Sequence, residues 1–78
     1  MCHVPDQPAL PLATLRKRKL LSQRALARAA GVALSTIYLL EVGRTEHATF
    51  AVMRKVSAAL DVPPESITEF RRRLGAEP

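Results

Sequence analysis

The side chains with the clearest capacity for binding chemistry in this sequence are its cations. Twelve Lys and Arg stand against seven Asp and Glu, which gives a net charge of +5. The excess is concentrated: residues 16–44 carry seven basic residues and a single acid, Glu41, a net charge of +6, whereas residues 45–78 carry five of each sign. A concentrated positive field favours a polyanionic partner. For any one residue of the run Arg16–Lys19, a solvated face that aids solubility is the alternative interpretation.

Other reactive side chains are few and scattered. His47 stands beside Glu46 in a predicted loop, where neighbours in sequence more often point apart than converge. Cys2 and His3 stand next to the start of the chain, where a His in third position could hold Cu(II) or Ni(II) with the terminal amine, but two ligands without a second cluster are a weak basis for a metal site. Catalysis needs a positioned nucleophile–base pair, two carboxylates or a metal cluster. We therefore expect no enzyme, no metal, no cofactor and no small-molecule ligand.

The composition also bounds the class of protein. No apolar run approaches the roughly 18 residues of a membrane span, and the first residues lack a basic-then-apolar signal pattern. The single Cys excludes an internal disulfide framework and is compatible with a reducing cytoplasm. We expect a soluble, cytoplasmic protein of one domain, near the lower end of what folds unaided.

Within the positive segment, residues 22–41 predict two short helices joined by a sharp turn. The Ser22 hydroxyl can cap the first helix, and Gly31 can adopt the left-handed conformation that a helix end needs where the chain reverses. Ala27 is short enough for two helices to cross closely. On the first helix Gln23, Leu26, Ala27 and Ala30 recur at helical spacing, and on the second Val32, Ile37 and Leu40 mark the expected inner face. This pattern is typical of a helix-turn-helix, whose second helix is shaped to lie in a DNA major groove.

The flanking sequence predicts three more helices and hence an all-α fold. We expect a loose, Pro-rich arm over 1–11, a helix-turn-helix domain over 12–74 and a short tail over 75–78. The additional helices are predicted over 12–19, over 50–60 with Thr49 as its cap, and over 65–74 after Pro63–Pro64, with a loop over 42–48. The expected inward residues are Leu12, Leu15 and Leu21, then Phe50, Met53, Val56 and Leu60. Three residues of the last helix are expected to face inward or toward a second copy: Ile67, Phe70 and Leu74.

Positions 12–70 resemble the Cro/CI-type (XRE-like) helix-turn-helix family of phage repressors and bacterial regulators. The resemblance is carried by LRKRK, LLSQRALARAAGV, LSTIYLLE and GR, and by a later pattern that ends in ALDV. The family begins its second helix with Gln, here Gln23, and places its small residue and turn Gly at Ala27 and Gly31. The resemblance implies a compact five-helix repressor-like domain that binds double-stranded DNA as a homodimer on a near-palindromic site.

The same resemblance implies roles for single residues. Arg16 and Glu41 would form a structural ion pair between the first and third helices. Phosphate contacts would fall to Gln23, Arg24, Thr36 and Arg44. The base-facing residues would be Leu34, Ser35, Tyr38 and Leu39. Two copies would associate through the last two helices.

The sequence departs from the family at the reading face. Members of the family place Gln, Arg, Lys, Ser or Asn there, because base edges are distinguished by paired donors and acceptors. Here Leu34 and Leu39 could only touch thymine methyls, and Ala33 lacks the oxygen that would cap the reading helix, a loss of roughly 1 kcal/mol. Three further departures are Leu20 for a usual Gly, Val42 for a usual Asn, and Glu46 where the loop often carries Lys.

Two functions remain open on this evidence. The first is a transcriptional regulator, most simply a repressor, whose specificity depends on methyl contacts and DNA shape. The second is a protein-interaction module, such as an antitoxin or adaptor, that uses Leu34, Tyr38 and Leu39 as an exposed apolar patch. The positive charge favours DNA.

Overall fold

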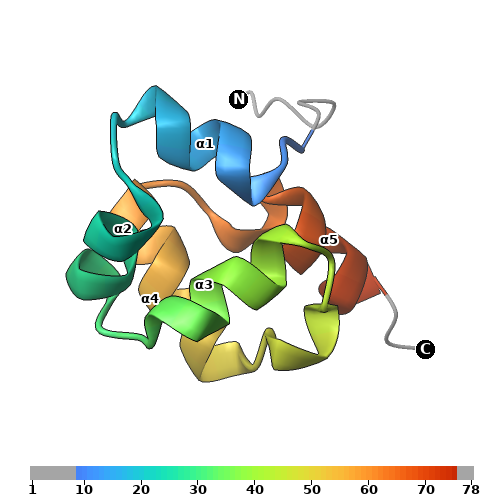
Figure 1. Ribbon diagram of the computed structural model, residues 1–78. Coiled ribbons are helices and arrows are strands. Elements are labelled where there is room, and N and C mark those ends of the chain that lie inside the picture. The colour runs from blue at the N-terminus through green and yellow to red at the C-terminus, as the bar shows by residue number, and fades with distance from the viewer. Residues whose placement is uncertain (1–8, 76–78) are drawn as a thin grey trace.

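Five short α-helices, joined by tight turns, make up the part of the chain that the structure describes, residues 9–75 (Figure 1). In this computed structural model the elements are α1 (Leu12–Arg18), α2 (Gln23–Ala30), α3 (Leu34–Glu41), the 3-10 turn η1 (Thr45–His47), α4 (Phe50–Leu60), the 3-10 turn η2 (Pro64–Ser66) and α5 (Thr68–Gly75). The predicted all-α, five-helix architecture is confirmed. Within residues 9–75, no helix has the length and hydropathy needed to cross a bilayer.

The α2–turn–α3 unit forms where local capping signals predict it. The Ser22 Oγ accepts a hydrogen bond from the Ala25 N–H (3.0 Å), which satisfies one of the unpaired amides at the start of α2. Gly31 ends α2 in the left-handed region (φ 74°, ψ 34°), and its N–H donates to the Ala27 carbonyl (2.9 Å). No atom lies within 4 Å of the position that a Cβ would take at Gly31, so the backbone conformation, not space, selects glycine there.

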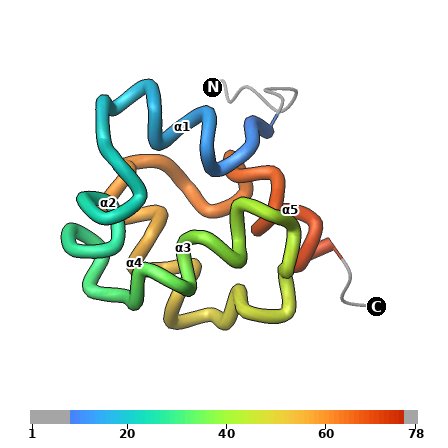
Figure 2. The backbone as a smooth tube through the Cα atoms, viewed as in Figure 1, coloured from blue at the N-terminus to red at the C-terminus, as the bar shows by residue number. Residues whose placement is uncertain are grey.

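One core holds the five helices together. Figure 2 shows α1 across the top of the molecule, α4 passing behind α3, and α5 on the opposite side from α2. The buried hydrophobic residues, each at most 5% exposed, are Leu12, Leu26, Ala27, Ile37, Leu40, Ala48, Met53, Val56, Leu60, Ile67 and Phe70. Leu15, Leu21, Ala30 and Val32 are half-buried at its edge. Ala27 lies where α2 packs on both α3 and α4, so its small size permits close packing.

The prediction for Phe50 is wrong. Its side chain is 72% exposed, whereas the buried residues of α4 begin one turn later, at Met53. Thr49 is the N-cap and its Oγ1 accepts from the Val52 N–H (3.2 Å), so Phe50 occupies the first helical position. The buried Ala48 supplies the apolar contact at that end of α4 instead.

The segment after α4 also differs from the predicted continuous helix over 65–74. Pro64–Ser66 forms η2, Ile67 is extended (φ −103°, ψ 121°), and α5 begins only at Thr68. Ile67 is extended because it forms a parallel bridge with Leu10, with one backbone hydrogen bond on each side (3.0 and 2.9 Å). The α-helix therefore cannot include Ile67, because the backbone of this residue pairs with Leu10 near the start of the chain.

Leu10 belongs to the segment expected as an arm, and both of these hydrogen bonds hold its backbone. The Leu12 N–H at the start of α1 donates to the Glu69 Oε1 (2.9 Å), so a carboxylate of α5 caps α1. The other residues of the expected arm and tail, 1–8 and 76–78, lie outside the described residues.

Candidate nucleic-acid interface

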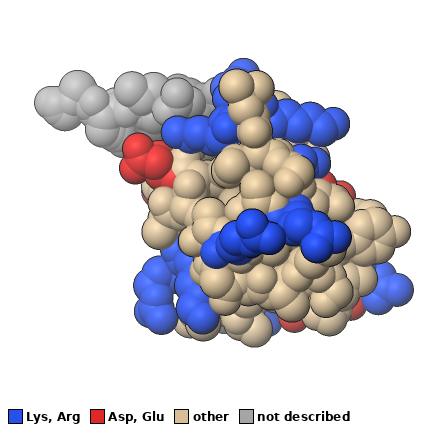
Figure 3. Space-filling model, turned by 60° about the vertical axis from the view of Figure 1, so that its left-hand side comes forward, with Lys and Arg blue, Asp and Glu red and all other residues tan. Residues whose placement is uncertain are grey.

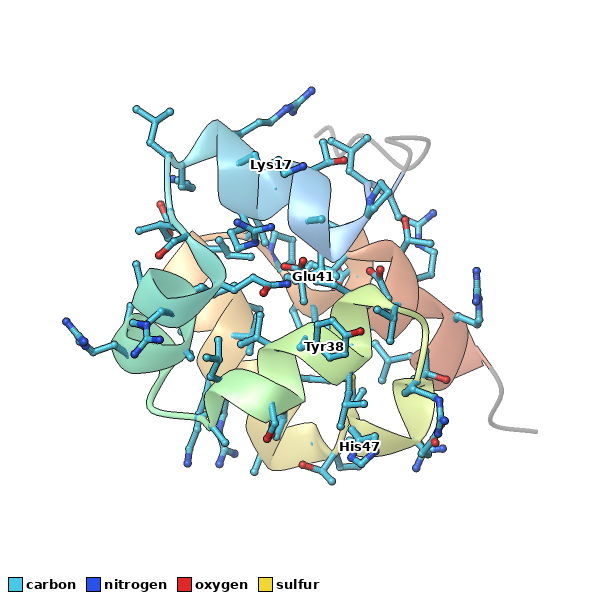
Figure 4. The ribbon with its side chains drawn as sticks, in the orientation of Figure 1. Lys17, Tyr38, Glu41 and His47 are labelled. Carbon is cyan, nitrogen blue, oxygen red and sulfur yellow. The ribbon has the colours of Figure 1, made fainter. Side chains whose placement is uncertain are left out.

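A buried ion pair ties α1 to the end of α3, as the resemblance implies. The Arg16 Nε donates to the Glu41 Oε2 (2.6 Å) and its Nη2 donates to the Glu41 Oε1 (3.2 Å). The two side chains are only 11% and 8% exposed, and Figure 4 shows Glu41 lying between α1 and α3. The Arg16 Nη1 also donates to the Leu21 carbonyl (2.8 Å), which fixes the connection between α1 and α2.

Gln23 extends this pair to α2. Its Nε2 donates to the Glu41 Oε1 (2.9 Å), so one carboxylate accepts hydrogen bonds from α1 and from the first residue of α2. We call Arg16, Gln23 and Glu41 the clamp. It connects α1, α2 and α3, and it uses the only acidic side chain of α3 internally, so that no negative charge remains on the exposed side of that helix.

The outer face of α3 is formed by uncharged residues. Ile37 and Leu40 point into the core, whereas Leu34 is 40% exposed and Tyr38 is 54% exposed, with Ser35 exposed beside them. Tyr38 projects from the ribbon of α3 in Figure 4. The face continues one turn further into Val42, which is 55% exposed. We call Leu34, Ser35, Tyr38 and Val42 the α3 face.

Leu39 and Thr36 flank this face and are half-buried. Leu34, Ser35 and Tyr38 thus lie on one surface as the base-facing assignment requires, whereas Leu39 offers only part of its side chain. At the start of α3, Ala33 has the extended conformation of an N-cap (φ −70°, ψ 147°), but no side chain caps the helix.

Exposed cations surround the α2–α3 unit. Of the seven basic residues in the positive segment, Arg16 is buried in the clamp and the other six are exposed. Because Arg16 and Glu41 neutralise each other, the surface of this segment keeps the whole charge of +6. Figure 3 shows Lys and Arg gathered over α1 and α2 on the face where α2 comes forward. The six residues are Lys17, Arg18, Lys19, Arg24, Arg28 and Arg44.

Arg44 is partly engaged by an acid. Its Nη1 donates to the Glu46 Oε2 (3.3 Å) in an ion pair whose side chains are 63% and 61% exposed. The pKa of the Glu46 carboxyl lies below its usual value, first because its own backbone N–H donates to it, with partial desolvation opposing, and then because Arg44 and His47 place positive charge nearby. The Glu46 carboxyl is therefore held in its ionised form beside Arg44, which the family resemblance assigns to a phosphate contact.

The other reactive residues of the sequence do not converge. His47 is exposed in η1, and Cys2 and His3 lie outside the described residues. Among residues 9–75, no three His, Cys, Asp or Glu side chains come together as a metal site would require.

Two of the three residues expected at a dimer interface are in the wrong place for it. Ile67, just before α5, and Phe70, on α5, are fully buried in the core of the single chain, so their side chains cannot contact a second copy. Leu74, at the end of α5, is 37% exposed.

An open apolar groove of about 560 Å³ lies between α4 and the end of α5, a feature that sequence reasoning missed. The exposed Phe50 and Leu74 line it. The remaining lining residues are Met53, Arg54, Ser57, Ala58, Asp61, Val62 and Pro64. The sequence feature that could have indicated this groove is Phe50, a large apolar residue directly after the Thr49 cap of α4.

A helix-turn-helix family model, HTH_3, matches residues 12–67, which is more than two thirds of the chain. The protein therefore belongs to this helix-turn-helix family, which is the XRE/Cro-CI type that the sequence resembles. The family is one of DNA-binding transcription regulators. The chain has no significant match among curated proteins or among solved structures.

Proposed function

We propose that this protein is a sequence-specific transcription regulator, most simply a cytoplasmic repressor, that inserts α3 into the major groove of double-stranded DNA. The observation that carries the proposal is the exposed α3 face beside six exposed cations, with the one acid of α3 withdrawn into the clamp. The DNA major groove is wide enough to admit an α-helix, and its flanking phosphates attract the cations around α3.

Phosphate contacts come from the residues around α3. Gln23 uses one N–H of its amide for Glu41, and the second N–H is available to a phosphate at the start of α2. Arg24 is exposed on the same turn, Thr36 flanks α3, and Arg44 follows it. These contacts set affinity and register, while Leu34, Ser35, Tyr38 and Leu39 meet the bases.

The active unit is a homodimer that places two copies of α3 about one DNA turn, roughly 34 Å, apart on a near-palindromic site. The pairing surface is the α4–α5 groove, with Phe50 and Leu74 as its exposed large apolar residues in place of the buried Ile67 and Phe70. Regulation then works by occupancy of the site, without catalysis.

Selection of random duplexes by the purified protein tests the proposal. Recovery of a shared near-palindromic sequence supports it. In the selected duplex, Tyr38→Ala and Leu39→Ala should alter site preference while binding to unrelated DNA stays largely intact, because they change the base-facing side and no phosphate contact. If both variants prefer the same sequence as the parent protein, α3 is not the reader.

A second function, a protein-interaction module, is favoured by one observation: Leu34 and Tyr38 expose apolar surface on the same side of α3. It predicts that Leu34→Ala and Tyr38→Ala abolish capture of a protein partner and that nuclease treatment does not. Capture that nuclease removes supports DNA binding instead.

A further inference from the structure

We propose that the α3 face recognises the 5-methyl groups of pyrimidines in the major groove, and not the hydrogen-bonding edges of the bases. This inference rests on the proposed DNA binding and specifies its chemistry. The ligand group is the methyl of thymine, or the same methyl on 5-methylcytosine.

The α3 face lacks the side chains that read the hydrogen-bonding edges of bases. Guanine is read by two donors of Arg or Lys, and adenine by the amide of Asn or Gln. No residue of α3 is Arg, Lys, Asn or Gln. Its one charged side chain, Glu41, is 8% exposed and accepts three hydrogen bonds from Arg16 and Gln23, so it cannot accept from a cytosine amine.

The nearby side chains that could replace these readers are not part of α3. The Gln23 amide, on α2, donates to the Glu41 carboxylate at 2.9 Å. Arg44 is bonded to Glu46 at 3.3 Å in the loop after α3. Arg24 and Arg28 lie on α2, which the helix-turn-helix places over the DNA backbone. Positive charge therefore surrounds the α3 face without being part of it.

What the α3 face offers is apolar surface. Leu34, Tyr38 and Val42 are spaced four residues apart along one side of the helix, and they are 40%, 54% and 55% exposed. The pyrimidine 5-methyl group is the apolar feature of the major groove that matches such a row. The hydroxyls of Ser35 and Tyr38 can each donate or accept, so they bond to several bases and discriminate little between them.

Each methyl group is expected to change the DNA-binding affinity modestly, and the effects of several methyl groups multiply. Burying one methyl-sized group changes an equilibrium about fourfold. With two methyls read in each half-site, a dimer meets four, and their combined removal should weaken binding on the order of 100-fold.

The test replaces thymine by uracil in the selected duplex, which removes the methyl and keeps every hydrogen-bonding group. Affinity is measured by fluorescence anisotropy for a duplex with uracil throughout both half-sites and for a control duplex with the same number of substitutions outside them. We expect a loss of tenfold or more for the first and less than twofold for the second. A second arm replaces each critical T·A pair by C·G or by 5-methyl-C·G, and the methylated duplex should bind several-fold tighter than the unmethylated one.

Protein variants connect the effect to the α3 face. Leu34→Ala should reduce the thymine-to-uracil affinity ratio, whereas Tyr38→Phe, which removes only a hydroxyl, should keep it. Leu20→Ala is the matched control, because Leu20 is 92% exposed and lies between α1 and α2. A ratio that Leu34→Ala and Leu20→Ala change equally overturns the assignment to α3.

The two proposals fail in different ways. If the selected duplex binds with strong salt dependence but uracil substitution leaves its affinity within twofold, methyl recognition is wrong and DNA binding stands. If no duplex is selected and α3 variants affect only a protein partner, both are wrong.

Discussion

Glu41→Gln should destabilise the protein far more than the same change elsewhere on its surface. The Glu41 carboxylate accepts hydrogen bonds from Arg16 at 2.6 and 3.2 Å and from Gln23 at 2.9 Å, and it is 8% exposed. Removing its charge leaves the Arg16 guanidinium, 11% exposed, without a counter-charge. Breaking one side of a buried pair costs about 3–5 kcal/mol. A chain of this length has a total stability of about 4–12 kcal/mol, so the loss is at least a quarter of it.

The assay is thermal unfolding followed by circular dichroism, supported by urea titration. About 3 kcal/mol should lower the Tm by roughly 12 °C or more in a domain of this size. The matched control is Glu46→Gln, the same chemical change in an ion pair whose side chains are 63% and 61% exposed, which should leave the Tm close to that of the parent. If the two variants have equal Tm values, the clamp does not stabilise the fold. The apolar double variant Arg16→Met/Glu41→Leu should recover much of the loss, because it leaves no unpaired charge.

Four further changes have predicted outcomes. Leu20→Gly should raise the free energy of unfolding by roughly 0.5–1 kcal/mol in urea titration, since Leu20 is exposed at φ 59° and the left-handed penalty exceeds the entropy that glycine adds; a fall would contradict it. Ala33→Ser should add about 1 kcal/mol by capping α3, and an unchanged Tm would show that water already serves this role. In NMR titrations of Arg44→Gln, the pKa of Glu46 should rise toward its usual value. Because the pKa of Glu46 is lowered in the folded protein, its contact with Arg44 stabilises the fold at pH values above the pKa of the unfolded chain. That stabilisation is lost as the pH falls through the pKa of the folded protein. Glu46→Gln should tighten DNA binding by releasing Arg44, whereas Glu65→Gln, which removes the same charge from η2 without affecting the Arg44 pair, should not.

The parts of the fold that were predictable have local causes. The hydroxyls of Ser22 and Thr49 each accept a hydrogen bond from the backbone N–H three residues further along, which caps α2 and α4. Gly31 ends α2 by adopting the left-handed conformation. Such signals act within one turn of helix and can be read from the sequence. The pair of Arg16 and Glu41, 25 residues apart, was predictable only through the resemblance to a family.

The parts that were missed depend on distant contacts. Glu69 caps α1 across 57 residues, and the bridge from Leu10 to Ile67 interrupts the helix that periodicity predicts to begin at Glu65. Phe50 matches the apolar period of α4, but it is the first residue of that helix, and the residues that reach the core begin at Met53. Periodicity identifies the faces of a helix, and tertiary packing decides where each face stops being buried. Ile67 and Phe70 show the same limit, because an apolar face does not reveal whether it meets the core or a second chain.

The salt dependence of DNA binding reports whether the positive surface around α3 contacts DNA phosphates. The affinity for the selected duplex is measured by fluorescence anisotropy across a series of salt concentrations. With six phosphates neutralised per dimer, three from each copy's exposed cations, the logarithm of the association constant should fall with the logarithm of the salt concentration with a slope of about −5. A slope near zero would mean that the positive surface around α3 does not contact DNA phosphates, and it would rule out the proposed insertion of α3 into DNA.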